Sequence, residues 1–467
     1  MNRRDFVKTA SGATAAAFVA PLFSIGRAGI PANSRLNVAM IGAGNIASMA
    51  YAGTPNENWV ALCDVDSTYL DEAKATHANA ANARTFRDFR EMFDKMGGEI
   101  DAVCISTPDH THFAATLWAM QHDCHVCTQK PLTRTVWESR ALLQAASEKP
   151  HLITNMANQG HTYDGIRQAR EWIEHGLIGE VKTVHSFESG PKWGNRWFQK
   201  PPSFPPPFEA IPETLEWDLW LGPLYPREFS SYYHPLKWRS FWDLGTGMLG
   251  DWFCHTCDGP VWSLGLYQPE YVELIGKDGD NGLTFIPDRS IVKWHFPARA
   301  NHPACDLFWY DGGLRPQRPE KWSWGPVPAR GSYFEGSENT LFLDERSNNP
   351  RLVNREEMIA FSRNGQPAER YERTVEKDPF KEWVAAIKGE GPLPGSRFEY
   401  AARLTEVALL GVLAQRFGGR LDWDAAQGRI TNRPELNAFL REPCRRDWII
   451  GETYPMQLDD SLRQPTL

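Results

Sequence analysis

The sequence lacks the features that mark nucleic-acid-binding and membrane-spanning proteins. Its 467 residues include 50 Lys and Arg against 58 Asp and Glu, and no cluster of basic residues stands out. Proteins that bind nucleic acid carry such a cluster, so we expect no nucleic-acid partner. No apolar run reaches the ~20 residues that span a bilayer, so we expect no stable membrane insertion. These absences leave a soluble globular protein, which at this length holds two or three domains.

Cysteines are few, and their pattern does not favour a metal. Eight are present and none precedes Cys63, so no lipid-attachment cysteine follows the N-terminal segment. Cys124/Cys127 and Cys254/Cys257 form two C-x-x-C pairs, a pattern that can bind zinc. The first pair falls on a predicted strand, whose alternation turns neighbouring side chains to opposite faces. We therefore predict no metal site, and either buried free thiols or a disulfide formed after export.

The N-terminal 33 residues carry the pattern of a twin-arginine export signal. Arg3 and Arg4 precede an Ala-rich, mildly apolar run over residues 9–25, and the small residues Gly26 and Ala28 follow it. We assign residues 1–33 to a signal peptide and predict export to the periplasm by the twin-arginine machinery. If the signal is not used, the protein stays in the cytoplasm.

The stretch Asn37–Ala47 organises the first domain. An apolar run ends in Gly42 and Gly44, with one residue between them, and Ala47 follows in the last position of a G-x-G-x-x-G/A dinucleotide fingerprint. Gly42 permits a sharp turn, and Gly44 lets the backbone approach a pyrophosphate at the start of the next helix. Asp64 follows Gly42 by 22 positions, close to the ~20 expected for the acidic residue that binds a ribose hydroxyl.

Predicted strands alternate with predicted helices throughout residues 34–157. One of these helices is expected over residues 86–96. This order predicts a doubly wound parallel sheet, a Rossmann domain, over those residues. Ligands of such sheets bind beyond the carboxyl ends of the strands. Two predicted strand-end loops therefore matter, residues 107–112 and the loop in which Lys130 precedes Pro131. We expect Lys130 to face the nicotinamide end of the dinucleotide site.

Residues 158–467 have a different pattern, which predicts an α+β domain with a mostly antiparallel open sheet. Predicted strands include residues 271–275, 291–296, 304–310 and 340–343, and helices over 380–388 and 398–417 close the domain. The chain holds 19 Trp residues. They are either core and loop packing or stacking platforms for sugar rings, and their number does not decide between the two.

Asp251 and His255 are the chemically suggestive pair of the second domain. They stand four positions apart on a probable helix within residues 243–258 and so share one helix face. An Asp beside a His can fix the tautomer of the imidazole and raise its basicity, which suits a general base. The alternative is an Asp that caps the helix and a His that is satisfied in the interior.

In these motifs the chain resembles the Gfo/Idh/MocA oxidoreductases, the family of glucose–fructose oxidoreductase and inositol dehydrogenase. The resemblance covers nearly all of the chain after the signal and is closest to a sub-branch that often carries twin-arginine signals. Three residues depart from the family pattern: Gln129 replaces a Glu, Ala47 replaces a glycine, and Cys127 replaces an aromatic residue. The matching residues are Gly42, Gly44, Asp64, residues 106–108, His112, Lys130, Pro131, residues 158–161, 217–222, Gly250, Asp251, His255 and residues 421–424.

The resemblance implies a hydride transfer between a carbohydrate hydroxyl and a nicotinamide cofactor. Lys130 would polarise the reacting oxygen, His255 would take its proton, and Asp251 would orient His255 or share its role. The carboxylate of Asp64 favours NAD over NADP. The implied cofactor contacts are Gly42, Gly44, Asn45, Ile46, Asp64, Thr107, Pro108, His112, Gln129, Lys130 and Asn158, and the implied substrate contacts are Gln159, His161, Tyr233, Trp238 and Arg239. The family also implies a homo-oligomer.

Export restricts the reaction, because free NAD is scarce outside the cytoplasm. An exported enzyme must retain its cofactor and regenerate it within the cycle. Either oxidation of one sugar is coupled to reduction of another carbonyl, or a transient oxidation drives redox-neutral cleavage of a glycoside. The remaining hypotheses are an ordinary cytoplasmic dehydrogenase and a non-catalytic nucleotide- or sugar-binding protein.

Overall fold

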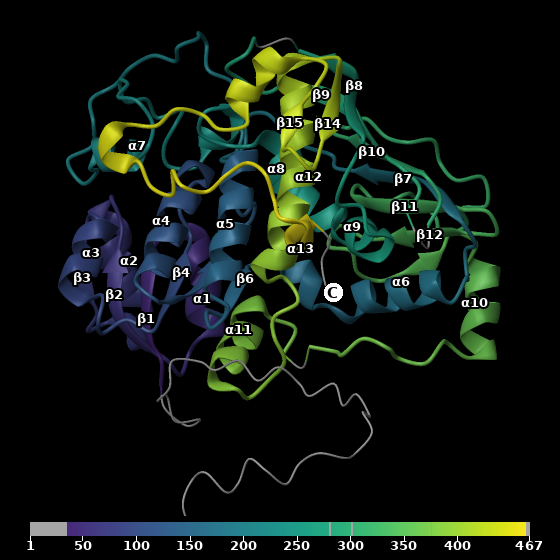
Figure 1. Ribbon diagram of the computed structural model, residues 1–467, viewed down its shortest axis with the longest axis horizontal. Coiled ribbons are helices and arrows are strands. Elements are labelled where there is room, and N and C mark those ends of the chain that lie inside the picture. The colour runs from purple at the N-terminus through teal and green to yellow at the C-terminus, as the bar shows by residue number, and fades with distance from the viewer. Residues whose placement is uncertain (1–34, 280–281, 300–301, 375, 464–467) are drawn as a thin grey trace, which may run out of the picture.

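The computed structural model describes residues 35–279, 282–299, 302–374 and 376–463. The predicted signal peptide, residues 1–33, lies outside the described residues. Two sheets organise the chain, one in each half, and helices lie between and around them (Figure 1).

The first sheet is parallel and has the strand order β3-β2-β1-β4-β5-β6. This order confirms the predicted doubly wound sheet, with the crossover between β1 and β4 that brings two strand ends together. Its strands are β1 (Asn37–Ile41), β2 (Asn58–Cys63), β3 (Arg84–Phe86), β4 (Ala102–Ile105), β5 (His125–Thr128) and β6 (Thr154–Met156). Its helices are α1 (Ser48–Gly53), α2 (Ser67–Thr76), α3 (Phe89–Met96), α4 (Asp109–Gln121) and α5 (Val136–Glu148).

Alternate residues of the first sheet build two separate apolar layers. Val38 and Met40 face α1, α2 and a helix from far along the chain, α11 (Pro379–Lys388). Ala39 and Ile41 face α3, α4 and α5 instead. The side-chain period of two in a strand explains this division. A helix from the second half of the chain thus completes the cover of the first sheet.

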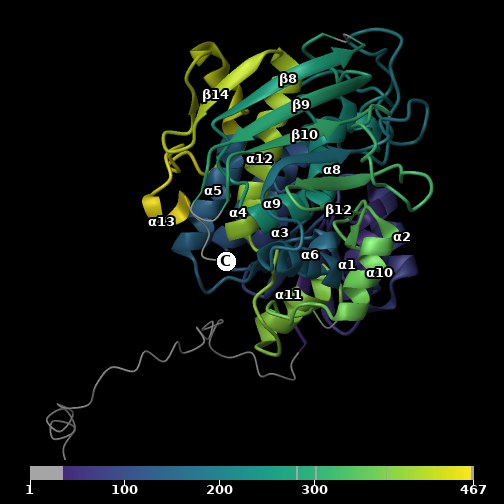
Figure 2. The ribbon, with the colours of Figure 1, turned by 90° about the vertical axis from the view of Figure 1, so that its right-hand side faces the viewer.

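The second sheet has nine strands in the order β13-β12-β11-β7-β10-β9-β8-β14-β15. Among the described strands of this second sheet, only β7 and β10 pair in parallel, so the prediction of a mostly antiparallel sheet is confirmed. Its neighbouring strands lie side by side in Figure 2. They are β7 (Val181–Phe187), β8 (Tyr271–Asp278), β9 (Arg289–Phe296), β10 (Cys305–Tyr310), β11 (Gly331–Gly336), β12 (Thr340–Leu343), β13 (Arg351–Leu352), β14 (Arg420–Asp424) and β15 (Arg429–Ile430).

One helix joins the two halves of the molecule. α12 (Phe398–Phe417) is buried on all sides over most of its length and lies between the two sheets (Figure 1). It packs on α5 of the first domain and on β8, β9 and α8 (Gly247–Thr256) of the second. A helix that is apolar all round is a buried core helix. The remaining helices are α6 (Asp164–Glu174), α7 (Trp217–Leu221), α9 (Asp258–Leu264), α10 (Arg355–Asn364) and α13 (Asp460–Arg463), and the 3-10 segments are η1 (Asn45–Ala47), η2 (Ala78–Ala80), η3 (Gln159–Thr162), η4 (Lys237–Ser240), η5 (Pro434–Phe439) and η6 (Arg446–Trp448).

The predicted helix over residues 86–96 is wrong at its start. Phe86 ends the short strand β3, and the helix α3 begins only at Phe89, capped by the side chain of Asp88. A strand of three residues offers too little alternation to separate it from the apolar pattern of the helix that follows.

Candidate active site

The glycine turn after β1 is as tight as the fingerprint requires. Gly42 has φ +85°, and a Cβ there would lie 2.7 Å from the backbone of Ser106. A Cβ at Gly44 would lie 2.5 Å from the ring of Tyr69. Both positions therefore accept only glycine, and the turn leads into η1 and α1.

Asp64 is held at the end of β2 by backbone donors. Its carboxylate accepts from the N–H of Ala43 at 2.7 Å and from that of Asp66 at 2.9 Å. Burial raises the pKa of Asp64 to about 6, although these N–H groups oppose the shift. The side chain thus ties the glycine turn to the end of the next strand.

A cavity lies at the carboxyl ends of the first sheet and has walls from segments that are distant in the sequence. Its empty space, including the mouth, is about 920 Å³. Seven of the predicted cofactor contacts line it: Gly42, Gly44, Asn45, Ile46, Asp64, Thr107 and Pro108. The opposite wall includes Trp197, Leu219, Trp220, His234, Trp238, Arg239 and Trp448.

The strand ends beside the cavity carry polar atoms that suit a dinucleotide. The hydroxyls of Ser106 and Thr107 and the amide nitrogen of Gln129 are buried without a hydrogen-bond partner among the described residues. Buried polar groups are normally paired, so unpaired ones at a cavity indicate a ligand. Together with the glycine turn and Asp64, they fit NAD, whose ribose and pyrophosphate these groups would hold.

Lys130 and Asp251 form the ion pair of the site. The Lys130 ammonium donates to the carboxylate of Asp251 at 2.8 Å and to its backbone carbonyl at 2.7 Å. Arg239 approaches the same carboxylate oxygen at 3.5 Å. Burial alone raises the pKa of Asp251, but the charges of Lys130 and Arg239 outweigh it and hold that pKa at about 2. Asp251 is therefore ionised, and Lys130 is held against α8.

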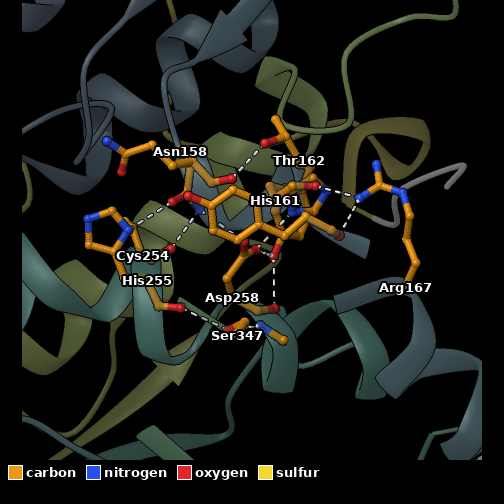
Figure 3. A network of polar contacts seen from close by, with 12 residues as sticks. Asn158, His161, Thr162, Arg167, Cys254, His255, Asp258 and Ser347 are labelled. Carbon is orange, nitrogen blue, oxygen red and sulfur yellow. Dashed lines mark hydrogen bonds and ion pairs between the residues drawn. The ribbon is translucent and has the colours of Figure 1, made fainter. Parts of the chain in front are cut away.

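The imidazole of His255 has a different partner. Its Nδ1 lies 3.1 Å from the amide oxygen of Asn158, and the edge of its ring contacts Trp252. Burial, with the charge of Lys130 as the next cause, lowers the pKa of His255 well below its usual value. Asp251 and His255 share a face of α8 as expected, yet the group bonded to Asp251 is Lys130. The group bonded to His255 is Asn158 (Figure 3).

Two predicted substrate contacts lie in the cavity wall. Trp238 and Arg239 line it, and the Arg239 guanidinium lies over the rings of Trp238 and Trp197 at 4.2 and 4.8 Å. Stacking of this kind fixes the orientation of a guanidinium. Arg239 is thus presented to the cavity beside Asp251.

The other predicted substrate contacts do not line the cavity. Tyr233 is buried among aromatic rings, with Trp217 and Phe241 as neighbours. Gln159 lies in η3 with its amide 3.0 Å from the sulfur of Met49. His161 is 1% exposed and its Nδ1 lies 2.9 Å from Asp258.

His112 and Asn158 are two further predicted cofactor contacts. His112 lies between the carbonyl oxygens of Thr107 and Pro131, at 2.8 Å from each, and burial lowers its pKa to about 4. It therefore joins the two strand-end loops that carry Thr107 and Lys130. Asn158 is fully buried behind His255.

Sequence reasoning missed Asp109, the first residue of α4. Its carboxylate accepts from the hydroxyl of Thr246, which precedes α8, at 2.8 Å. The bond ties α8, with Asp251 and His255, to the first domain. Burial raises the pKa of Asp109 to about 7, since the nearby charges only partly offset it. Its place directly after Thr107 and Pro108 was the available signal.

The described residues hold neither a metal-binding cluster nor a helix that could cross a membrane. No group of His, Cys, Asp and Glu in the described part of the chain has the arrangement of a metal site. The eight cysteines are free thiols in the structure. Among the described helices, none is long and apolar enough to cross a bilayer.

Comparison with known families agrees with this architecture. The model of the Gfo/Idh/MocA oxidoreductase family, NAD-binding Rossmann fold, matches residues 36–156, and the model of the C-terminal alpha/beta domain of the family matches residues 163–275. The chain belongs to the Gfo/Idh/MocA oxidoreductase family. Its first sheet is the NAD-binding domain of that family.

Two named relatives of this Gfo/Idh/MocA protein act on carbohydrates. D-glucoside 3-dehydrogenase of Escherichia coli K12 is 29% identical over 153 residues, which are 32% of this chain and 42% of that protein. Levoglucosan dehydrogenase of Pseudarthrobacter phenanthrenivorans is 32% identical over 155 residues, 31% of this chain and 39% of that protein. The chain thus matches about two fifths of the length of these relatives.

Solved structures share the fold over a longer span. The WlbA dehydrogenase of Bordetella pertussis, in complex with NADH and UDP-GlcNAcA, has a TM-score of 0.57 and 15% identity, covering 84% of this chain and 99% of that one. A levoglucosan dehydrogenase in complex with NADH has a TM-score of 0.52 and 18% identity, covering 83% and 99%. At these identities the likeness concerns the fold alone.

Proposed function

We propose that the protein is an NAD-dependent oxidoreductase that acts on a CH–OH group of a sugar, cyclitol or glycoside. The observation that carries the proposal is the pairing of Lys130 with Asp251 on the helix that carries His255, where Asp251 also contacts Arg239 in the wall of the cavity that holds the fingerprint turn. The carbohydrate specificity of the named relatives supports the substrate class.

Lys130, Asp251 and His255 have different roles in removing the hydroxyl proton of the substrate. Two hydrogen bonds to Asp251 orient the Lys130 ammonium and leave its third N–H for the reacting oxygen of the substrate. A fixed cation at that point stabilises developing alkoxide. The neutral imidazole of His255 accepts the hydroxyl proton. NAD, when bound, supplies the acceptor for the hydride.

The nucleotide end favours NAD over NADP. A carboxylate at Asp64 accepts hydrogen bonds from ribose hydroxyls and repels a 2′-phosphate. Arg87 also lines the cavity, but it donates to the carbonyl oxygens of Val65 and Thr214 and lies 4.0 Å from Glu216. These partners occupy a cation that could otherwise receive a phosphate.

A clasp over the nucleotide end supports slow release of the cofactor. We define the clasp as residues 214–216 paired with residues 65–67. Ser67 N–H donates to the Thr214 carbonyl at 3.0 Å, and Glu216 N–H donates to that of Val65 at 2.9 Å. The segment reaches from the second domain across the end of β2. Retained NAD suits an exported enzyme that recycles its cofactor, either by coupled sugar oxidation and reduction or by redox-neutral glycoside cleavage.

The first experiment uses the mature protein purified without added nucleotide. We expect mass spectrometry of the denatured protein to detect NAD, and sugars or aryl glycosides added to the intact protein to change absorbance at the NADH band. Retained NAD without net NADH indicates a closed cycle, and release of the aglycone then selects the glycosidase. A protein that binds NAD but exchanges hydride with no carbohydrate would refute the proposal and favour a binding protein.

Export and assembly are part of the same proposal. We propose periplasmic localisation through the twin-arginine machinery and a homo-oligomeric state. Fractionation of cells that carry the Arg3→Lys and Arg4→Lys double variant tests export, and light scattering of the mature protein tests assembly. Retention of the variant in the cytoplasm is the expected result.

A further inference from the structure

A polar network lies behind His255 and is shut off from the cavity. Asn158 and Asp258 are fully buried, and His161 is 1% exposed. Figure 3 shows the imidazole of His255 at one edge of the network, with Asn158 between it and Asp258. None of these three residues lines the cavity, and neither does His255, which is 4% exposed. The hydrogen bond between Asn158 and His255 is the link between this network and the proposed reaction.

The amide of Asn158 has one possible orientation. Its nitrogen donates to the Cys254 carbonyl at 2.6 Å and to the Asp258 carboxylate at 3.0 Å. The Cys254 carbonyl can only accept a hydrogen bond, so the group that faces it must be the amide nitrogen. A flipped amide would place its oxygen against two acceptor oxygens, and its two N–H groups would lose both partners. The amide oxygen therefore faces His255.

Asp258 is fixed in place by several hydrogen-bond partners. It accepts from the Asn158 amide at 3.0 Å and from the hydroxyl of Tyr400 at 2.5 Å, and Nδ1 of His161 lies 2.9 Å from it. The acceptor that orients Asn158 is thus built into the interior.

An amide oxygen only accepts, so the atom that faces it must carry a proton. Nδ1 of His255 lies 3.1 Å from that oxygen. Which imidazole nitrogen is protonated is set by the hydrogen bond that the other makes. We infer that Asn158, oriented by Asp258 and the Cys254 carbonyl, is a positioning residue that holds neutral His255 in its Nδ1–H tautomer and leaves the lone pair on Nε2 to receive the substrate proton.

This inference deepens the proposed function and rests on it for its catalytic meaning. It also reassigns two roles that the sequence suggested. Asn158 acts behind His255 rather than on the cofactor, and the tautomer is set by an amide rather than by Asp251, which is bonded to Lys130. His161 belongs to the same support, because it contacts Asp258 and not the cavity.

Nuclear magnetic resonance of protein labelled with ¹⁵N-histidine tests the tautomer directly. The mature protein is measured with its cofactor complement as purified, and the signals of His255 are identified by their loss in His255→Gln. We expect a protonated Nδ1 and an unprotonated Nε2 at neutral pH. A proton on Nε2 instead would overturn the inference without any variant of Asn158.

Asn158→Leu removes the oxygen that selects the tautomer. We expect signals of both tautomers and a fall in kcat of about 10–100-fold, with KM and NAD content unchanged. Asn155→Leu is the matched control, because Asn155 is equally buried but donates to the carbonyl of Pro379. It should leave the His255 signals as they are.

The outcomes separate the inference from the proposed function. Unchanged His255 signals and unchanged kcat in Asn158→Leu would refute the positioning role, even if the protein oxidises carbohydrates. The expected tautomer in a protein that oxidises no carbohydrate would support the positioning of His255 and refute the proposed activity. The tautomer is read without substrate, so neither result depends on the other.

Discussion

The nucleotide end of the site, which lines the cavity, and its reaction end, where Asp251 contacts Arg239 of the cavity wall, are built in different ways. The nucleotide end comes from one short stretch, since Gly42, Gly44 and Asp64 stand within 23 consecutive residues and meet through a strand, a turn and a strand. The reaction end joins residues far apart in the chain, with Lys130 121 positions from Asp251 and Asn158 97 positions from His255. Local sequence therefore determines where NAD is expected to bind, while tertiary packing determines what can be done with it.

The two ends should also differ in their sensitivity to single substitutions. At the nucleotide end, backbone N–H groups and glycines form most of the site, so the loss of one side chain should have a moderate effect. At the reaction end, single charged or titratable groups lie next to the expected reacting atoms. Substitutions there should cost far more turnover and little affinity for the nucleotide.

The largest effect is expected for Lys130→Ala. Removal of the cation that stabilises alkoxide should lower kcat by about 10³-fold, with NAD content unchanged. Progress curves with an oxidised carbohydrate and mass spectrometry of released nucleotide measure both. Lys149→Ala is the control, because Lys149 pairs with Asp123 near the surface. Equal turnover in Lys130→Ala and wild type would remove Lys130 from the mechanism.

The next effect is expected for His255→Gln. Loss of the proton acceptor should lower kcat by about 10²-fold or more, and the effect on NAD affinity should again be small. Trp252→Phe, next to it on α8, keeps an aromatic ring and provides a control for packing against the helix. If His255→Gln changed only KM, the imidazole would serve binding rather than proton transfer.

The same contrast explains how much of the fold the sequence could predict. The bounds expected for α12, residues 398–417, agree with the structure, because a long helix-forming run that lies between Gly395 and Gly418 is a strong signal. α10 (Arg355–Asn364) was missed, since it has no buried residues and depends on its Asn354 cap. That α11 covers the first sheet is a long-range contact that no local pattern contains.

The residues of the site also differ in whether the sequence could predict them. The fingerprint turn and Asp64 followed from spacing, and the i, i+4 relation of Asp251 and His255 followed from helix period. The hydrogen-bond partners of Asp251 and His255 did not follow from the sequence, because Lys130 and Asn158 reach them from other elements. Trp448, which lines the nucleotide end from near the C-terminus, has no sequence signal that connects it to β1.

A moderate effect is expected at Asp64, and it should depend on pH. With a pKa of about 6, raised mainly by burial, the carboxyl becomes protonated as the pH falls through that value and then accepts ribose hydrogen bonds poorly. NAD affinity should therefore weaken by about 10-fold from pH 7.5 to 5, the value of one charge-assisted hydrogen bond. Titration calorimetry on protein stripped of nucleotide measures this dependence.

Asp64→Asn is the matched variant for that measurement. It should bind NAD more weakly at pH 7.5, discriminate less against NADP and show a flat pH profile between these values. A profile as steep as that of the wild type would assign the pH dependence to another group, such as Asp109, whose pKa burial raises to about 7.

The smallest effect is expected at the clasp, which brings a segment distant in the sequence to the nucleotide end. Arg87→Ala removes the donor to the carbonyls of Val65 and Thr214 and should speed NAD release by about 5-fold, equivalent to about 1 kcal/mol. Exchange of bound NAD against labelled NAD measures the rate. Arg84→Ala is the control, because Arg84 lies on β3 outside this cavity. If both variants released NAD at the wild-type rate, retention would come from the walls of the cavity, and the two ends would differ even more than the clasp suggests.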